Sequence, residues 1–194
     1  MISFLRGNFL VRNPAQVVVD VNGVGYECQI SLNTYSAING KTTGLLFTYL
    51  QITENAQTLY GFAEQAEKDL FIHLISVSGV GAATARMMLS GMKPDETVRA
   101  IVQGNARQLE SIKGIGRKTA ERLVLELRDK LGKISLESTV LPSASNKMET
   151  DALNALVSLG IVRPQAEQAI KKALLANPDT TILEDLIKQA LKNV

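Results

Sequence analysis

The chain has 194 residues, 45% of them hydrophobic and 21% charged, which is enough apolar material for one large domain or two to three small ones. With one cysteine (Cys28) and one histidine (His73), it excludes an intrachain disulfide framework and an ordinary zinc site built from Cys and His alone. No apolar run approaches the roughly 20 residues that span a bilayer, and the N-terminus lacks the pattern of a signal peptide, so we expect a soluble, cytoplasmic protein without a membrane segment.

The formal net charge of +2 is spread unevenly along the chain. Residues 1–62 and residues 146–194 each carry equal numbers of basic and acidic side chains, whereas residues 107–133 hold eight Lys and Arg against four Asp and Glu. A local excess of cations is typical of a nucleic-acid-binding segment, although it also fits an ordinary solvated helix face.

The first 62 residues have the pattern of a β domain and hold eight of the nine aromatic residues. The dipeptide Asn22-Gly23 between two apolar runs predicts a type I′ hairpin turn. The strands and the short helical piece that we expect are Ile2–Val11, Gln16–Val21, Val24–Ile30, Leu32–Ile38 (helical), Gly44–Ile52 and Gln57–Phe62. This pattern favours a small closed barrel of the oligonucleotide-binding (OB) type, whose aromatic side chains could pack in the core or stack on bases.

From Ala63 to Lys133 the apolar spacing becomes helical and contains an internal repeat. Segment 74–85 matches segment 109–120, and each copy has a Gly-x-Gly sequence between two apolar helical runs. A helix, a tight Gly-x-Gly hairpin and a second helix leave backbone N–H groups free at a helix N-terminus, where they bind phosphate without reading a base. The repeat therefore predicts a protein that holds the nucleic-acid backbone at two points.

Residues 132–147 contain four serines and a proline and predict a flexible linker. Beyond it, the apolar spacing predicts three short helices, over Met148–Leu159, Pro164–Ala176 and Ile182–Lys192. A small neutral bundle on a tether is typical of a module that docks another protein.

Patterns that could carry catalysis are incomplete. Gly40-Lys41-Thr42 lacks the rest of a phosphate-binding P-loop, and the Gly-x-Gly segments lack the βαβ frame of a dinucleotide site. His73 lies in an apolar helical run, where a structural role is favoured. We therefore expect no catalytic centre, no metal and no cofactor.

The second repeat, Lys113 to Leu123, resembles the tandem helix-hairpin-helix domain of the RuvA family of DNA-binding subunits. Three N-terminal segments resemble the barrel of the same family: Met1–Gly7, Val21–Glu27 and Gln57–Phe62. The resemblance spans the chain and implies a multidomain α+β fold: an N-terminal five-stranded OB-fold β-barrel, a central all-α tandem helix-hairpin-helix domain and a small C-terminal three-helix (UBA-like) bundle. The expected boundaries are 1–63, 64–133, 134–146 for the linker and 147–194.

The resemblance implies a non-catalytic subunit that binds four-way (Holliday) DNA junctions and holds them open during recombination and repair. It also implies a homotetramer or a face-to-face octamer, a C-terminal domain that docks a hexameric ATPase of the RuvB type, and a junction resolvase as a further candidate partner. Backbone amides of the hairpins would hold phosphates, α-helical cations would add charge, and threonine hydroxyls would cap or touch phosphate. The DNA-binding residues carried over in this way are Gly79, Val80, Gly81, Thr84, Gly114, Ile115, Gly116, Arg117, Lys118, Thr119 and Arg122.

In this family an acidic pin lies between the last two barrel strands, and four copies meet at the junction centre, where they repel phosphates. Glu54 matches the pin, but Asn55 stands where the family pattern has a second acid, which predicts weaker repulsion. The first hairpin also departs from the pattern, because Ala82 and Ala83 stand where a cation often follows. We therefore expect the second hairpin to dominate the affinity for DNA.

Two other functions fit parts of the sequence. A helix-hairpin-helix DNA repair enzyme, a glycosylase or lyase, would need a catalytic side chain beside a hairpin, and Lys118 is the candidate. A single-strand-binding OB protein would use the aromatic barrel and treat the helices as appendages. Strand cleavage of damaged duplex and competition between junction, duplex and single strand separate these functions from junction binding.

Overall fold

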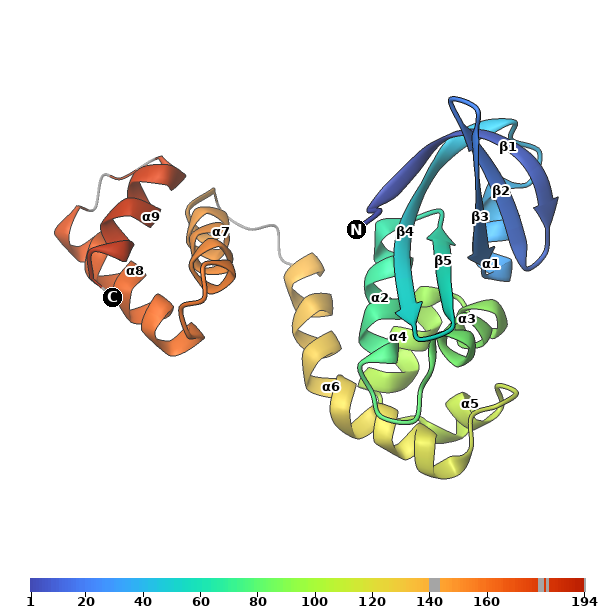
Figure 1. Ribbon diagram of the computed structural model, residues 1–194. Helices are drawn as coiled ribbons and strands as arrows, with labels where there is room; N and C mark the ends of the chain where they lie inside the picture. The colour runs from blue at the N-terminus through green and yellow to red at the C-terminus, as the bar shows by residue number, and fades with distance from the viewer. Residues whose placement is uncertain (140–143, 178–179, 181, 194) are drawn as a thin grey trace. The chain divides into compact units, whose positions relative to one another are not determined.

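The computed structural model describes residues 1–139, 144–177, 180 and 182–193. The chain divides into two compact units, Met1–Ser135 and Leu136–Val194. The first unit combines a β-barrel with a helical domain that packs against it, and the second contains the helices α7, α8 and α9 (Figure 1).

The N-terminal strands close into a barrel in the order β1-β2-β3-β5-β4, in which β3 and β5 are parallel and the other neighbours antiparallel. A short helix between β3 and β4 completes the OB topology. The elements are β1 (Phe4–Asn13), β2 (Gln16–Val21), β3 (Val24–Ile30), α1 (Leu32–Ile38), β4 (Thr43–Thr53) and β5 (Ala56–Phe62). The predicted strands and helical piece are confirmed, with ends that shift by no more than two residues.

The turn between β2 and β3 has the conformation that its sequence predicts. The φ angles of Asn22 and Gly23 are 52° and 88°, and a type I′ turn requires positive φ at both positions. The Asp20 carboxylate accepts a hydrogen bond of 2.8 Å from the Gly23 amide, which holds the loop closed. This turn sets the β2–β3 register and with it the alternation that buries Val17 and Val19 in the barrel.

The helical domain shares its core with the barrel. It contains α2 (Gln65–Ile75), α3 (Ala82–Gly91), α4 (Pro94–Val102), α5 (Ala106–Glu110) and α6 (Arg117–Thr139). The Phe71 ring on α2 lies with its centroid 5.5, 5.1 and 4.9 Å from the ring centroids of Tyr49, Tyr60 and Phe62, which come from β4 and β5. Because buried aromatic rings make large, shape-dependent contacts, this cluster joins the barrel and the helical domain into one packed body.

The C-terminal unit is built on alanines. Its helices are α7 (Ala144–Ser158), α8 (Arg163–Ala176) and α9 (Leu183–Leu191). Leu156, Ile170 and Leu186 supply the larger core side chains. The buried small residues, which let the helices approach closely, are Ala152, Ala166, Ala169, Ala173 and Ala190. The three predicted helices are confirmed.

The segment predicted as a linker, 134–146, differs in secondary structure. Helix α6 continues to Thr139 and α7 begins at Ala144, so helix occupies both ends of the segment, while residues 140–143 lie outside the described residues. Serines disfavour helix initiation, but extending a helix that already exists costs much less than starting one. The flexibility of this segment and the domain boundaries remain predictions.

Candidate nucleic-acid interface

The two Gly-x-Gly segments have the same backbone conformation. In the first, the Val80 amide donates to the Val77 carbonyl at 3.0 Å across a turn whose third residue, Gly79, has a φ of 92°. In the second, the Ile115 amide donates to the Ile112 carbonyl at 3.0 Å, and the third residue of the turn, Gly114, has a φ of 93°. A bond from the fourth residue to the first, with positive φ at the third, is typical of a type II turn and favours glycine there.

The match extends to the helices on either side. The helix before each hairpin ends at a serine, Ser76 or Ser111, whose hydroxyl donates to the carbonyl three residues earlier at 2.7 Å. The helix after each hairpin begins with a bond to the carbonyl of the second glycine, at 2.9 Å for Gly81 and 3.0 Å for Gly116. The repeat in the sequence is therefore reproduced in the turn bond, the serine hydroxyl bond and the first bond of the following helix.

Free backbone donors lie beside the second glycine of each hairpin. The amides of Gly81, of Gly116 and of the residues that open α3 and α6 have no acceptor within the described part of the chain. A Cβ atom added at Gly81 or Gly116 would meet nothing within 4 Å, so the space beside these two glycines is open. An uncapped helix N-terminus with open space before it fits the oxygen atoms of a phosphate.

The middle residues of the hairpins do not offer free amides, which corrects the expectation for Val80 and Ile115. Their N–H groups already donate inside the turns, because closing a type II turn uses the amide of its fourth residue. Their side chains are 4% and 5% exposed and belong to the core of the helical domain. These residues therefore anchor the hairpins, and the glycine and helix-opening amides remain as candidate phosphate donors.

The predicted cations on α6 differ in their surroundings. The Arg117 Nε atom pairs with a Glu121 carboxylate oxygen at 2.9 Å, and this hydrogen bond raises the pKa of the Arg117 guanidinium. Arg122 pairs in the same way with Glu126 at 2.9 Å. Exposed pairs of this kind contribute little free energy, so a phosphate can replace the carboxylate as partner. Lys118 is exposed and has no ion-pair partner among the described residues.

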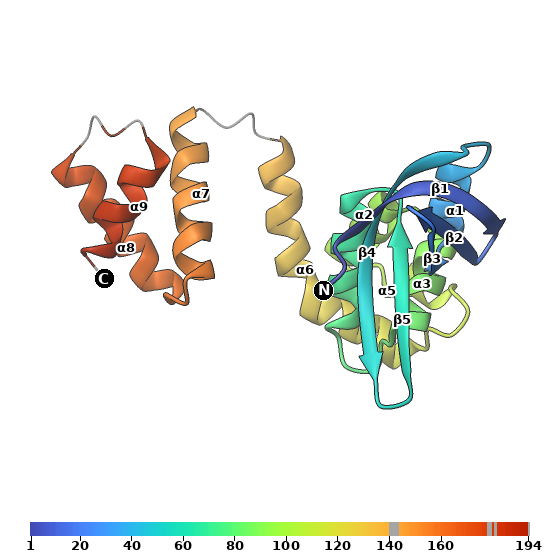
Figure 2. The ribbon, with the colours of Figure 1, turned by 45° about the horizontal axis from the view of Figure 1, so that its top comes forward.

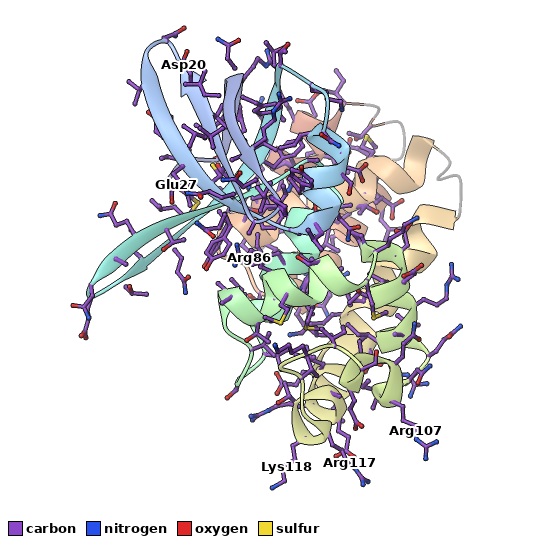
Figure 3. The ribbon with its side chains drawn as sticks, turned by 90° about the vertical axis from the view of Figure 1, so that its right-hand side faces the viewer. Asp20, Glu27, Arg86, Arg107, Arg117 and Lys118 are labelled. Carbon is purple, nitrogen blue, oxygen red and sulfur yellow. The ribbon has the colours of Figure 1, made fainter. Side chains whose placement is uncertain are left out.

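Sequence reasoning missed two further cations in this region. Lys113 is exposed and stands inside the turn of the second hairpin, and Arg107 is exposed on α5. Arg107, Arg117 and Lys118 project from the end of the helical domain opposite the barrel (Figure 3). The excess of cations over residues 107–133 includes both residues and was the signal for them, whereas the residues assigned from the family motif did not include either.

The two hairpins also contact each other reciprocally. The Arg122 guanidinium donates to the Ser78 carbonyl in the first hairpin at 3.4 Å. The Met87 sulfur lies 3.9 Å from the position that a Cβ atom would take at Gly114 in the second. Residues 87 and 122 are equivalent in the repeat, so each second helix contacts the opposite hairpin. Packing between the units therefore sets the spacing of the two phosphate sites.

Thr84 and Thr119 occupy the third position of α3 and α6 and are half-buried. Within the described residues neither hydroxyl forms a hydrogen bond, and the Gly81 N-cap of α3 receives no side-chain cap. A helix-capping role is therefore not seen in this structure, and contact of the two hydroxyls with phosphate stays a prediction.

The residues predicted as the acidic pin lie on an exposed tip. Strands β4 and β5 pair up to Thr53 and Ala56, which leaves Glu54 and Asn55 as a two-residue loop. Residues 52–57 are exposed, and Figure 2 shows the β4–β5 hairpin extending beyond the rest of the barrel as an arm. One carboxylate per chain therefore reaches solvent at the tip, and its action at a junction centre stays a prediction.

The barrel offers little aromatic surface for base stacking. Tyr60 and Phe62 are buried, and Tyr49 packs with them around Phe71. Of the barrel aromatics, Phe4 is the one with more than half of its surface exposed, at 54%. Core packing therefore accounts for most of them, which weakens the single-strand-binding hypothesis.

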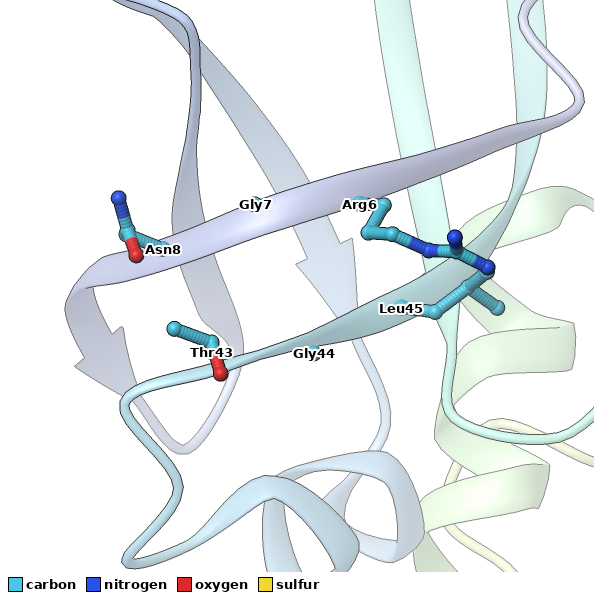
Figure 4. A pocket seen from close by; sticks show the side chains of 6 residues that line it. All are labelled: Arg6, Gly7, Asn8, Thr43, Gly44 and Leu45. Carbon is cyan, nitrogen blue, oxygen red and sulfur yellow. The ribbon is translucent and has the colours of Figure 1, made fainter.

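A shallow hollow of about 350 Å³ lies on the outer face of β1 and β4 (Figure 4). It lies over Gly7 and Gly44, which face each other across the two strands. The residue pairs on either side, Arg6 with Leu45 and Asn8 with Thr43, line it with their side chains. The glycines are required inside the barrel, where a Cβ at Gly7 would stand 2.0 Å from the Asp20 carbonyl oxygen. The hollow is thus explained by strand closure and contains no hairpin residue.

Other chemistry is not indicated in the described part of the chain. No group of three or more His, Cys, Asp and Glu side chains there is placed to hold a metal ion. No helix in the same residues is long and apolar enough to cross a membrane. Burial raises the pKa of the Cys28 thiol to about 12, so this cysteine is kept in its unreactive thiol form.

Three family models match consecutive parts of the chain: the RuvA N terminal domain over residues 1–61, a SAM-like helix-hairpin-helix tandem over residues 71–129 and the RuvA C-terminal domain over residues 147–194. Proteins named Holliday junction branch migration complex subunit RuvA match over the full length. Those from Christiangramia forsetii and Flavobacterium psychrophilum are each 45% identical to this chain over 194 aligned residues. Each alignment covers 100% of this chain and 100% of the relative. The protein from Pelobacter propionicus is 42% identical to this chain over an alignment of 200 residues. This alignment covers 100% of this chain and 99% of the relative.

Proposed function

Since the chain belongs to the RuvA family, we propose that it binds four-way (Holliday) DNA junctions as the non-catalytic subunit of a branch migration complex. The observation that carries this proposal is the pair of hairpins with matching hydrogen bonds, open amides and a fixed mutual spacing. One hairpin of this kind predicts contact with DNA, whereas two in one packed domain hold a duplex arm at two points.

The hairpins act on the DNA backbone. The amides of Gly81 and Gly116 donate to phosphate oxygens, and Lys113, Arg117 and Lys118 neutralise phosphates beside the second site. Amide–phosphate contacts carry no sequence information, so the geometry of the DNA and not its base sequence selects the binding site.

Junction preference arises from assembly into a homotetramer, with a face-to-face octamer as the alternative. Four copies place four helical domains against the four arms and bring four Glu54 tips to the centre, where carboxylates repel phosphates. Asn55 removes the charge of a second acid from each tip, so the repulsion is weaker than with two acids per chain.

The C-terminal unit docks the motor, a hexameric ATPase of the RuvB type. Two pairs of large apolar side chains that are at least 57% exposed are candidates for this contact: Leu159 and Val162 between α7 and α8, and Leu175 and Ile182 around the end of α8 and the start of α9. A junction resolvase as a further partner and a cytoplasmic location remain predictions.

A competition gel shift tests the proposed function. The full chain is mixed with a labelled synthetic four-way junction and increasing unlabelled junction, linear duplex or single strand, and the mass of the complex is measured in the same sample. We expect the junction to compete best, with four copies of the 21.0 kDa chain on it, and affinity to fall by roughly 10³-fold or more between 50 and 200 mM salt if about six phosphates are contacted. Equal competition by duplex, or a flat salt response, would overturn the proposal.

The repair-enzyme hypothesis has a separate test. Lys118, its candidate nucleophile, is exposed on the first turn of α6 and therefore solvated rather than enclosed in a base-binding pocket. Incubation with abasic or damaged duplex should leave the DNA intact, and strand cleavage or base release would favour the enzyme.

A further inference from the structure

Arg86 is the single Lys or Arg between residues 72 and 92, which span the first hairpin and α3. Its guanidinium does not face the DNA-binding end. The Nη1 atom donates to the carbonyl of Ala15 at 2.9 Å and to the side-chain oxygen of Gln29 at 2.7 Å, and both acceptors belong to the barrel. Figure 3 shows Arg86 where the barrel meets the helices, away from Arg117 and Lys118.

Three other hydrogen bonds hold α3 to the barrel domain, and all lie at its C-terminal end. The Ser90 hydroxyl accepts a hydrogen bond of 3.1 Å from the Leu32 amide, and the Asn33 side chain donates to the carbonyls of Leu89 and, at 3.0 Å, Met92. The N-terminal half of α3 packs in the core through Ala82 and Ala85, but apolar packing is non-directional and supplies no directed contact with the barrel near the hairpin. Arg86 is the fifth residue of α3, about 7.5 Å along the axis from Gly81 at a rise of 1.5 Å per residue, so it supplies the second anchor near the hairpin.

We propose that Arg86 is a positioning residue that fixes the first hairpin relative to the barrel and thereby favours four-way junctions over linear duplex. The inference rests on the proposed junction binding. The barrel carries the Glu54 tip and α3 carries the Gly81 amide, so the Arg86 bonds set the separation between a phosphate on the arm and the carboxylate at the centre. In a junction, a shifted hairpin either loses its phosphate or brings phosphates closer to the Glu54 carboxylates, whereas a duplex engages the hairpins alone, so misplacement weakens junction binding selectively.

The competing explanation is that Arg86 binds a DNA phosphate directly, and the chain offers a matched variant that separates the two. Gln29→Ala removes an acceptor from the barrel and changes no charge, so it disturbs positioning without removing a cation. If Arg86 binds phosphate, Arg86→Ala should lower the slope of log affinity against log salt by about one, and Gln29→Ala should have no effect.

The experiment measures Kd for a four-way junction and for a linear duplex of the same length across a salt series, together with the melting temperature. We expect Arg86→Ala to lower the duplex-to-junction Kd ratio by about tenfold and Gln29→Ala by about threefold, with duplex affinity and salt slope kept. Because both variants break one linkage, the double variant should be little worse than Arg86→Ala. Arg86→Lys, which keeps the charge but not the planar fork, should lie between wild type and Arg86→Ala.

Arg99→Ala on α4 is the control, because it removes an exposed arginine that has no ion-pair partner in the described residues, and the ratio should not change. Three outcomes would overturn the inference. The first is an unchanged duplex-to-junction Kd ratio in Arg86→Ala, and the second is a reduced salt slope in Arg86→Ala while Gln29→Ala has no effect. The third is an equal loss of junction and duplex binding together with a lower melting temperature. If the wild-type chain shows no junction preference, the proposed function fails instead.

Discussion

The two helix-hairpin-helix units have the same backbone and different electrostatics. Their turns, serine caps and first helical bonds agree to within 0.1 Å. Residues 107–118 nevertheless carry four Lys and Arg and one Glu, whereas the equivalent residues 72–83 carry no Lys, Arg, Asp or Glu. The comparison shows that the shape of a phosphate site and its charge are set by different residues and can vary independently.

The difference follows from what lies behind each unit. The first unit packs against the barrel, and its Arg86 is used in that contact, while the equivalent position of the second unit holds Glu121 paired with Arg117. The second unit lies at the end of the helical domain opposite the barrel, where Arg107, Arg117 and Lys118 project into solvent (Figure 3). We infer that the first hairpin contributes placement and the second contributes most of the affinity.

The largest expected effect removes the charge of the second unit. Arg117→Ala/Lys118→Ala should weaken junction binding on the order of 10- to 100-fold and lower the salt slope by about two, because two phosphates are no longer neutralised by a cation. Ala83→Lys, which places a cation at the position equivalent to Lys118, should strengthen binding by only a few fold. Gel-shift titration at several salt concentrations measures both, and the ranking of the hairpins is wrong if the double variant changes affinity no more than Ala83→Lys does.

The second glycine of each hairpin tests the open space before the amides. Alanine fits at Gly81 and Gly116, so Gly116→Ala should lower junction affinity about tenfold and Gly81→Ala somewhat less, because the methyl group stands where the phosphate approaches. The free energy of unfolding should change by no more than about 1 kcal/mol in either variant. Gly91→Ala, at the other end of α3, is the matched control, and a Gly116→Ala protein with wild-type affinity would contradict the phosphate site.

The first glycine of each hairpin tests the equality of the two backbones. Gly79 and Gly114 have φ of 92° and 93°, so alanine at either position should lower the free energy of unfolding by about 1–2 kcal/mol. Urea denaturation measures the change, and the two values should agree to within about 0.5 kcal/mol. A cost at one position without a cost at the other would show that the units are not structurally equivalent.

The smallest expected effect concerns pH and acts through the first unit alone. Glu67 on α2 is 3% exposed and accepts hydrogen bonds from Ser31 and, at 2.6 Å, from Thr34 of the barrel domain. Burial raises the pKa of Glu67, and the two hydroxyls partly oppose this, so the folded state binds this proton more tightly than the unfolded chain does. The second unit has Val102 at the equivalent position.

Because the folded-state pKa of Glu67 is raised, its stabilising contribution is present below the ordinary glutamate pKa and is lost as pH rises through the folded value. Glu67→Gln keeps the size of the side chain and removes the ionisation. Its unfolding free energy should therefore improve relative to wild type as pH rises above about 4.5, measured by urea denaturation at each pH. Glu27→Gln, on an exposed residue of β3, serves as the control, and a difference that does not vary with pH would contradict the assignment.

Much of the fold could be predicted because its signals are local. Asn22-Gly23 sets a turn through its own φ angles, and the alternation around it defines two strands to the residue. The helical ends near 134–146 were missed, since composition reports helix initiation poorly once a preceding helix can extend. The two glycine pairs form the predicted hairpins, but the Val80 and Ile115 amides already donate inside the turns, because the motif does not say which amide closes the turn. Phosphate binding at the hairpins stays a prediction.

By itself the sequence determined the repeat, the turn chemistry, the uneven charge and the order of three parts, since each depends on residues a few positions apart. Only the tertiary structure decided which cations project from the end of the helical domain and which hold the protein together. Arg86 is in sequence an ordinary helical cation, yet its partner Gln29 lies 57 residues away, and Arg122 reaches Ser78 across 44. Contacts at such separations depend on how whole elements pack, and no local pattern specifies them.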